Sequence, residues 1–186
     1  TKEQNVSRGN LLSLFSSRKK AMKYLNIILV TVPVWYVMGI LVTFAPEMMK
    51  SMGVTGFIPN PGKCIMYAYL GITIGDMASG LISQVLKSRK KALGIFLTLT
   101  VISITMYFTV APISEFIFYC VIGFVGFATG YWAVFMSTAA ELFGTNIRST
   151  VTTTAPNFVR GSLIFVSWAV SVFETYMSTV GSAIVV

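Results

Sequence analysis

KCIMYAYLGITIGDMASGLISQVLKSRKK, residues 63–91, is the stretch that decides the fold: a mostly apolar run that closes with four cations. As a helix, 63–86 is long enough to cross a hydrocarbon core about 30 Å thick. A membrane strand would need only about ten residues of alternating polarity, whereas this run is apolar on all sides. The stretch therefore predicts a membrane-spanning helix that ends in a short basic turn.

Similar apolar runs recur along the chain, which has 55% hydrophobic residues and a mean hydropathy of +0.77. We predict five full spans at 24–45, 63–86, 92–111, 115–140 and 149–173. A sixth apolar stretch opens at about Tyr176, and we expect that span to be cut short at Val186. A water-soluble surface cannot be built around so many long apolar runs. The predicted fold class is all-α, an integral membrane helical bundle.

The Lys and Arg residues predict the orientation of the bundle. Eleven fall on one side of the predicted spans: Lys2, Arg8, Arg18, Lys19, Lys20, Lys23, Lys87, Arg89, Lys90, Lys91 and Arg148. Only Lys50 and Lys63 fall on the other, so the positive-inside rule puts the N-terminus in the cytosol. We expect a multi-pass plasma-membrane protein, in a bacterium an inner-membrane protein, in contact with the lipid bilayer. Because these cations are spread over loops on one membrane face, we expect no nucleic-acid partner.

The polar segment 1–23 precedes the first span. Asn10 can cap a short helix whose apolar residues, such as Leu11 and Leu14, recur at helical spacing opposite its cations. Such an amphipathic helix would lie on the cytosolic leaflet. The alternative is a solvated linker whose periodicity is accidental.

Composition argues against several activities. The chain has no histidine and six acidic residues, and it has no phosphate-binding glycine loop with its lysine. Nothing in it resembles a convergent nucleophile and base. We therefore expect no enzyme, no cofactor and no metal site.

Three charges lie within or at the edge of predicted spans: Asp76, Glu141 and Arg160. Hydrocarbon tolerates such groups only where they face protein or water, so each is a candidate functional residue. Counted along their helices from Lys87 and Arg148, Asp76 and Arg160 are at similar depth, roughly 16 and 18 Å. They can pair with each other, as a structural pair, or Arg160 can hold an anion while Asp76 takes up a coupling proton.

The fifth span contains the run TTTAPN, residues 152–157. Its proline frees backbone groups that the threonines and Asn157 can satisfy, and such a broken helix is tolerated only where protein or water covers it. We therefore add Asn157 to the candidate cavity residues.

Two basic-side loops resemble those of the major facilitator superfamily. In that family the second and third helices of each half are joined by a loop of sequence Gly-x-x-x-Asp-Arg-x-Gly-x-Arg-Arg. When Gly80 is aligned with the first glycine of this motif, Gln84 stands at the position of the acid and Lys87 at that of the second glycine. Arg89 and Lys90 stand at the positions of the final basic pair. The segment ELFGTNIR, 141–148, is similar to the Glu-x-Phe-Pro-Thr-x-x-Arg loop of sugar and organic-ion porters. Glu141 and Arg148 can pair with charges on the neighbouring turn, such as Arg89, as a cytosolic gate. The alternative is two solvated charges.

The resemblance covers nearly the whole chain and implies the C-terminal half of such a transporter, with 1–23 as the linker from an N-terminal half. It implies secondary active transport of a small organic solute, an organic anion or a sugar, by alternating access and coupled to protons. The family's cavity-lining helices correspond to spans one and four, which makes Trp35, Tyr36, Tyr131 and Trp132 candidate cavity residues; packing or lipid contact is the alternative for each. The rival function is a channel or a structural helix bundle.

Overall fold

The computed structural model describes residues 14–143 and 145–174, and this part of the chain is helical with no strand. The elements in order are α1 (Arg18–Tyr36), the π-helix η2 (Val37–Val42), α2 (Ala45–Ser51), α3 (Pro61–Val85), α4 (Arg89–Thr109), the 3₁₀ turn η3 (Ala111–Ile113), α5 (Glu115–Thr129), α6 (Trp132–Leu142) and α7 (Thr145–Glu174). The predicted all-α class is confirmed for these residues.

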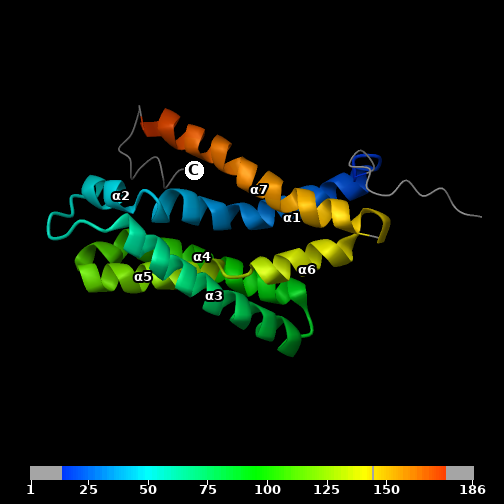
Figure 1. Cartoon of the computed structure of the whole chain (residues 1–186), viewed down its shortest axis with the longest axis horizontal. Helices are drawn as coiled ribbons and strands as arrows, with labels where there is room; N and C mark the ends of the chain where they lie inside the picture. Colours follow the sequence, from blue (N-terminus) through cyan, green and yellow to red (C-terminus); the bar gives the residue numbers. More distant parts are fainter. Residues whose placement is uncertain (1–13, 144, 175–186) are drawn as a thin grey trace, which may run out of the picture.

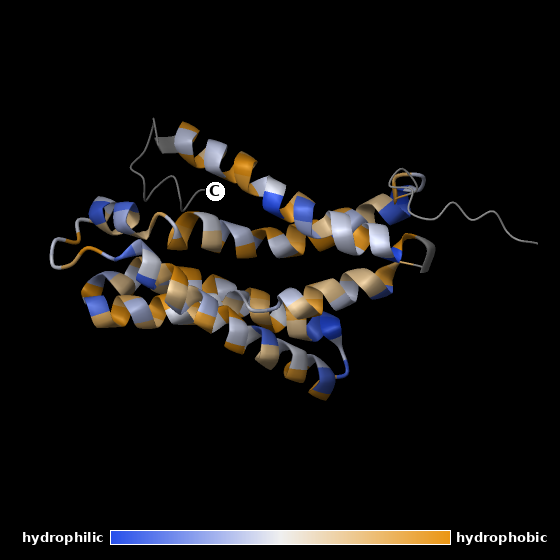
Figure 2. Cartoon of the chain, in the orientation of Figure 1, coloured by the Kyte–Doolittle hydropathy of each residue, from blue (hydrophilic) through white to orange (hydrophobic). Residues whose placement is uncertain are grey.

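Four helical stretches within the described residues are long and apolar enough to cross a membrane. They are Arg18–Val42, Pro61–Val85, Arg89–Ile113 and Glu115–Leu142, and they agree with the first four predicted spans to within a few residues at most ends. Figure 2 shows their apolar bodies in orange and hydrophilic residues gathered at the ends of α3 and α4. Length and composition therefore indicate a membrane protein.

The connections alternate between the two ends of the bundle. One end holds the start of α1, the α3–α4 turn and the junction of α6 with α7, and we call it the basic end (Figure 1). The α1–α3 and α4–α5 connections lie at the opposite end. In the view of Figure 1, α1 runs between α7 and the group formed by α3, α4, α5 and α6.

The predicted fifth span, 149–173, lies within the continuous helix α7, but α7 is not among the four strongly apolar stretches. Its first half carries Thr152, Thr153, Asn157 and Arg160, which lower its hydropathy. Its place as a fifth membrane span stays a prediction. The sixth span, expected from about residue 176, lies outside the described residues.

The N-terminal boundary differs from the prediction. The cations from Arg18 to Lys23 belong to the first turns of α1, which begins six residues before the expected start of span one. Because α1 runs on through this segment, the C-terminal part of the predicted amphipathic helix is not a separate element. Its beginning lies outside the described residues.

Glycines bring α3 and α5 into backbone contact. A Cβ at Gly71 would lie 2.1 Å from the Gly123 carbonyl oxygen, and one at Gly126 would lie 2.1 Å from that of Ala68. Gly75 of α3 makes a similar contact, with the Phe127 carbonyl oxygen 2.2 Å from its Cβ position, whereas Gly80 faces open space. These glycines serve helix packing, because only a residue without a side chain admits a neighbouring backbone this closely.

The fourth predicted span is broken into two helices. α5 ends at Thr129 and α6 begins at Trp132, with Gly130 and Tyr131 between them in non-helical conformations. Hydropathy alone predicted a continuous helix over 115–140. The contacts that hold this break also create part of the candidate site.

Candidate functional site

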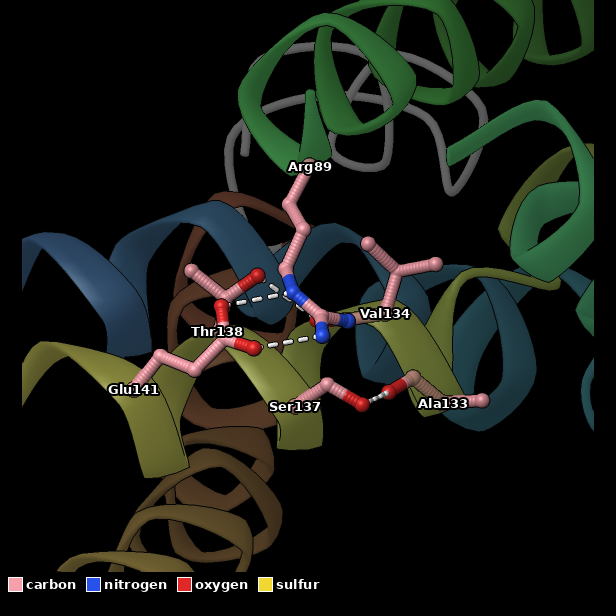
Figure 3. Close-up of polar contacts among 6 residues, drawn as sticks. All are labelled: Arg89, Ala133, Val134, Ser137, Thr138 and Glu141. Atoms are coloured by element: carbon pink, nitrogen blue, oxygen red, sulfur yellow. Dashed lines mark hydrogen bonds and ion pairs between the residues drawn. The ribbon is translucent and has the colours of Figure 1, made fainter. Parts of the chain in front are cut away.

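An ion pair joins α4 to α6 at the basic end of the bundle. Arg89 Nε donates to Glu141 Oε2 at 2.7 Å and Arg89 Nη2 donates to Glu141 Oε1 at 2.5 Å, as Figure 3 shows. Arg89 is the first residue of α4, whose N-cap Ser88 accepts the N–H of Lys91 through its side chain. Glu141 lies in the last turn of α6. The arginine therefore projects from a capped helix start onto a helix end 52 residues further along the chain.

This pair borders a cleft of about 760 Å³ between the end of α3, the α3–α4 turn and α6. On the α6 wall, Ser137 and Thr138 turn their hydroxyls back onto the helix and donate to the carbonyls of Ala133 and Val134, at 2.9 and 2.7 Å (Figure 3). The hydroxyl donors on this wall are therefore already used within the helix.

Of the three predicted gate residues, Arg89 and Glu141 are in contact. Arg148 lies on the first turns of α7, where its side chain is exposed and forms no ion pair with any residue in the described ranges. The pairing anticipated between Glu141 and the neighbouring turn is thus present, and Arg148 takes no part in it. Whether the pair acts as a gate stays a prediction.

Asp76 contacts the start of α6. Its Oδ1 accepts the Ala133 N–H at 3.1 Å, in the first turn of a helix whose own N-cap, Tyr131, offers no side-chain cap. Helix N-termini carry unpaired N–H groups and a partial positive charge, so a carboxylate is stabilised there. The Asp76 side chain, which belongs to α3, therefore caps the N-terminus of α6.

A carbonyl at the end of α5 also has a side-chain partner. Thr100 Oγ1 of α4 lies 3.0 Å from the Ala128 carbonyl oxygen and shares its hydroxyl proton between this carbonyl and that of Phe96 in its own helix, at 2.8 Å. Tyr131 ties the break to α1, because its hydroxyl donates to the Val30 carbonyl at 2.9 Å. An interrupted helix at membrane depth persists only when its freed groups are satisfied. Asp76 of α3 and Thr100 of α4 contact such groups here, and the Tyr131 hydroxyl holds the break against α1.

Arg160 lies over Trp35, one of two tryptophan rings in contact. Its guanidinium carbon lies 5.4 Å from the centroid of the Trp35 ring, within the range of a cation–π interaction. The rings of Trp35 and Trp132 meet edge to face, with centroids 6.3 Å apart and planes at 76°. The structure thus brings three predicted cavity residues from α1, α6 and α7 together.

The indole nitrogen of Trp35 is the single buried side-chain polar atom in the described part of the chain that has no hydrogen-bond partner. Leaving such a donor unsatisfied costs about 1–3 kcal/mol. Asn157, one turn before Arg160, uses its side-chain nitrogen to donate to the Thr153 carbonyl at 3.0 Å. Asn157 therefore bonds to the backbone of its own helix beside Pro156, and its side chain is exposed. The carbonyl that Pro156 itself frees is that of Thr152, so the predicted role of Asn157 stays a prediction.

Two predicted cavity residues lie elsewhere. Tyr131 is fully buried and its hydroxyl is used by Val30, so it belongs to the core rather than to a cavity. Tyr36 lines an apolar groove of about 560 Å³ with Pro33 of α1 and residues of α4 and α7, such as Val166. The sequence predicted a cavity position for both Trp35 and Tyr36. They are consecutive residues of one helix, so their side chains point about 100° apart and meet different neighbours.

Asp76 and Arg160 do not pair. Asp76 is engaged by the backbone of α6, whereas Arg160 lies over Trp35. Similar depth along two helices does not fix which way each side chain faces, and of the two alternatives left open, the structural Asp76–Arg160 pair is not formed. The two charges are instead linked indirectly through Trp132, whose ring meets Trp35 and which begins the helix that Asp76 caps.

Sequence reasoning missed several polar contacts. Thr100 had no assigned role, although a threonine in the middle of an apolar span signals a helix–helix hydrogen bond. Tyr24 donates to Thr154 Oγ1 at 2.7 Å and ties α1 to α7. Within the residues that the structure describes, no group of three or more Cys, Asp or Glu side chains is arranged to hold a metal ion.

Comparison with known proteins adds no identity to this geometry: no protein family, no curated protein and no solved structure matches the chain.

Proposed function

We propose that this chain is one half of a secondary active transporter of the major facilitator type, which moves a small organic solute by alternating access. The observation that carries the proposal is the Arg89–Glu141 ion pair. It joins the two segments that resemble the family's loops, and these segments lie far apart in the sequence. A chance resemblance in two loops would not require them to meet.

The α3–α4 turn offers further support. Lys87 has a φ of 48°, the left-handed conformation that glycine adopts most readily. It stands where the family's loop has its second glycine. The turn thus has the backbone geometry that the motif's glycine would serve, although a lysine occupies the position.

The ion pair of a transport gate has to hold one conformation of the transporter and then break when the conformation changes. The Glu141 and Arg89 side chains are 57% and 36% exposed, and exposed ion pairs are typically worth about 1 kcal/mol or less. Such a pair favours one conformation without locking it, because a conformational change can exchange it for water at little cost. Its bidentate geometry adds specificity to the closed arrangement.

For the substrate we favour an organic anion. The Arg160 guanidinium lies over the Trp35 ring and makes no ion pair within the described residues, so its N–H groups are available to a carboxylate. Trp35 and Trp132 offer apolar ring surface beside that charge. We assign the coupling proton to Asp76, because neutralising this carboxylate would weaken its contact with the start of α6, the helix that carries Glu141.

The N-terminal half of the same transporter is the proposed partner, within a lipid bilayer. α7 exposes several large apolar side chains, including Ile164, Phe165 and Trp168 at 72%, 73% and 67%. A second half or lipid would cover such a surface. A channel would instead require a ring of identical subunits around a pore, so a defined cyclic oligomer in detergent would favour that alternative.

The gate is tested by accessibility. In a variant whose Cys64 and Cys120 are replaced by alanine, a cysteine placed at Ser137 reports on the cleft beside the ion pair. Glu141→Gln should raise the rate at which a membrane-impermeant maleimide labels this cysteine, because α4 and α6 are no longer tied together.

The matched control is Lys91→Gln, which removes a charge from the same turn but leaves the Arg89–Glu141 pair intact. The double variant Arg89→Glu with Glu141→Arg should restore the slow labelling. Equal labelling rates in the parent and in Glu141→Gln would contradict the gate.

Transport itself is tested in proteoliposomes with benzoate, a planar carboxylate, and glucose, a neutral sugar. This chain alone should take up neither solute, since a cavity between halves would have only one wall. Co-expressed with its N-terminal half, it should show saturable benzoate uptake that Arg160→Gln abolishes. Saturable uptake by the monomeric chain alone would refute the half-transporter proposal.

A further inference from the structure

The cleft at the basic end has the features of an anion site. Its lining includes three cations, Lys87, Arg89 and Lys90, and one acid, Glu141. Arg89 is held by Glu141, whereas Lys87 and Lys90 form no ion pair with any residue in the described ranges. The cleft lining therefore carries two ammonium groups without an ion-pair partner in the described residues, Lys87 on the turn between α3 and α4 and Lys90 in the first turn of α4.

A serine that is mostly buried as a residue lines the α3 wall of the same cleft. Ser83 is 8% exposed, and its side chain makes no hydrogen bond within the part of the chain that the structure describes. Most serine hydroxyls in these helices donate to a carbonyl one turn back, as Ser137 does across the cleft. Trp35 Nε1 is the sealed polar atom without a partner in the described residues, so the Ser83 oxygen opens onto the cleft, where its hydroxyl is free to donate to a ligand.

The backbone keeps Lys87 in its place. The Ser88 N–H donates to the Ser83 carbonyl at 3.3 Å and the Lys87 N–H to that of Gln84 at 3.1 Å, which closes the turn tightly around a left-handed lysine. A residue other than glycine is disfavoured in this conformation. The strained turn sets the Lys87 side chain one turn beyond Ser83, at the mouth of the cleft.

We propose that this cleft binds the phosphate group of an anionic ligand, with the Ser83 hydroxyl donating to a phosphate oxygen and the ammonium groups of Lys87 and Lys90 balancing its charge. Phosphate offers several strong acceptor oxygens, which suits one hydroxyl donor and two flexible cations. Binding here does not depend on the proposed transport function, although the Arg89–Glu141 pair borders the same cleft.

The apolar surroundings favour a phospholipid as the source of the phosphate. Leu81 and Val85, on the last turns of α3, are 60% and 80% exposed, next to the turn. Acyl chains can cover these side chains while the headgroup enters the cleft. Clusters of cations directly beyond a membrane helix commonly bind anionic lipids.

The experiment measures lipid affinity of the purified full chain by native mass spectrometry with phosphatidylglycerol and phosphatidylcholine. Ser83→Ala should weaken phosphatidylglycerol binding about tenfold, the usual effect of losing a hydrogen bond to a charged group. Lys87→Asn should weaken it about fivefold, since one surface lysine contributes about that factor. Asparagine is chosen because it tolerates the left-handed backbone.

Lys91→Gln is the matched control, because Lys91 belongs to the same basic turn but does not line this cleft. Its effect should stay within about twofold, whereas a merely solvated basic turn predicts equal losses for Lys87 and Lys91 and none for Ser83. Ser83→Ala replaces a hydroxyl without adding bulk, and its unfolding temperature shows whether the fold is kept. Equal lysine effects, or an unchanged affinity in a folded Ser83→Ala protein, would overturn the proposal.

Competition with inorganic phosphate shows whether the bound phosphate group belongs to a lipid headgroup or to free phosphate. If a lipid headgroup is the ligand, phosphatidylglycerol should bind at least tenfold more tightly than phosphatidylcholine, and millimolar phosphate should displace it only weakly. If free phosphate is the ligand, phosphate alone should stabilise the parent against heat and leave Ser83→Ala unaffected. Binding of neither ligand would refute the site.

Discussion

Replacing Gly75 by alanine is a direct test of how α3 packs against α5. A Cβ at Gly75 would lie 2.2 Å from the Phe127 carbonyl oxygen and 3.0 Å from the Gly130 Cα. Ordinary van der Waals contact begins at 3.4 Å, so the two backbones must separate by about 1.2 Å. The atoms met are backbone atoms, which no rotamer change can move aside.

The magnitude follows from two opposing terms. Alanine favours the helix over glycine by about 1 kcal/mol. Forcing extra volume into a tight interface typically costs about 1–3 kcal/mol and occasionally more. We expect the upper part of this range, because Gly71 and Gly126 make equally close contacts along the same helix pair and prevent a local adjustment.

The matched control is Gly80→Ala on the same helix, where a Cβ would meet no atom within 4 Å. Gly80→Ala should gain the higher helix propensity of alanine without a steric clash, and so be as stable as the parent or slightly more stable. The two variants therefore differ by the packing cost alone, about 1–3 kcal/mol.

Thermal unfolding of both variants in the same detergent, followed by tryptophan fluorescence and by size-exclusion chromatography, measures this difference. Gly75→Ala should unfold several degrees below Gly80→Ala. If the two variants unfold at the same temperature, the close contact of α3 with α5 is not a feature of the folded protein.

Two further substitutions test the helix break. Asp76→Ala should destabilise the protein by about 1–3 kcal/mol in detergent, because the Ala133 N–H loses its partner, whereas Asp76→Asn keeps an acceptor oxygen and should lose less; equal losses would argue against capping. Tyr131→Phe should cost about 0.5–1.5 kcal/mol, measured in the same way, because the Val30 carbonyl loses a buried hydrogen bond; an unchanged unfolding temperature would place the hydroxyl in water instead.

Hydropathy predicted most of the helices well. The bodies of α3 and α4 coincide with predicted spans, because a long apolar run has no stable conformation in a membrane other than a helix. The break between α5 and α6 was not predicted, since Gly130 and Tyr131 lie within an apolar run. The helix α2 was also missed; it is only seven residues long and buries Met48 and Met49.

The candidate site was predictable only in part. The pairing of Glu141 with Arg89 could be anticipated, because both charges lie at helix ends on the same predicted side of the membrane. The partners of Asp76 and Arg160 could not, because they depend on how the helices are rotated about their axes. A polar side chain inside a bundle takes whichever neighbour faces it, a backbone N–H in one case and an indole ring in the other.

The sequence by itself determined that the chain forms long apolar helices, which charges cluster between them, and that its basic turns fall on one side. These properties depend on local composition and on the cost of placing charge or an unpaired peptide group in hydrocarbon. The tertiary structure alone decided that glycines join α3 to α5, that Asp76 caps α6 and that Arg160 lies over Trp35. These contacts depend on the distance and rotation between helices, which arise from packing among side chains far apart in the chain.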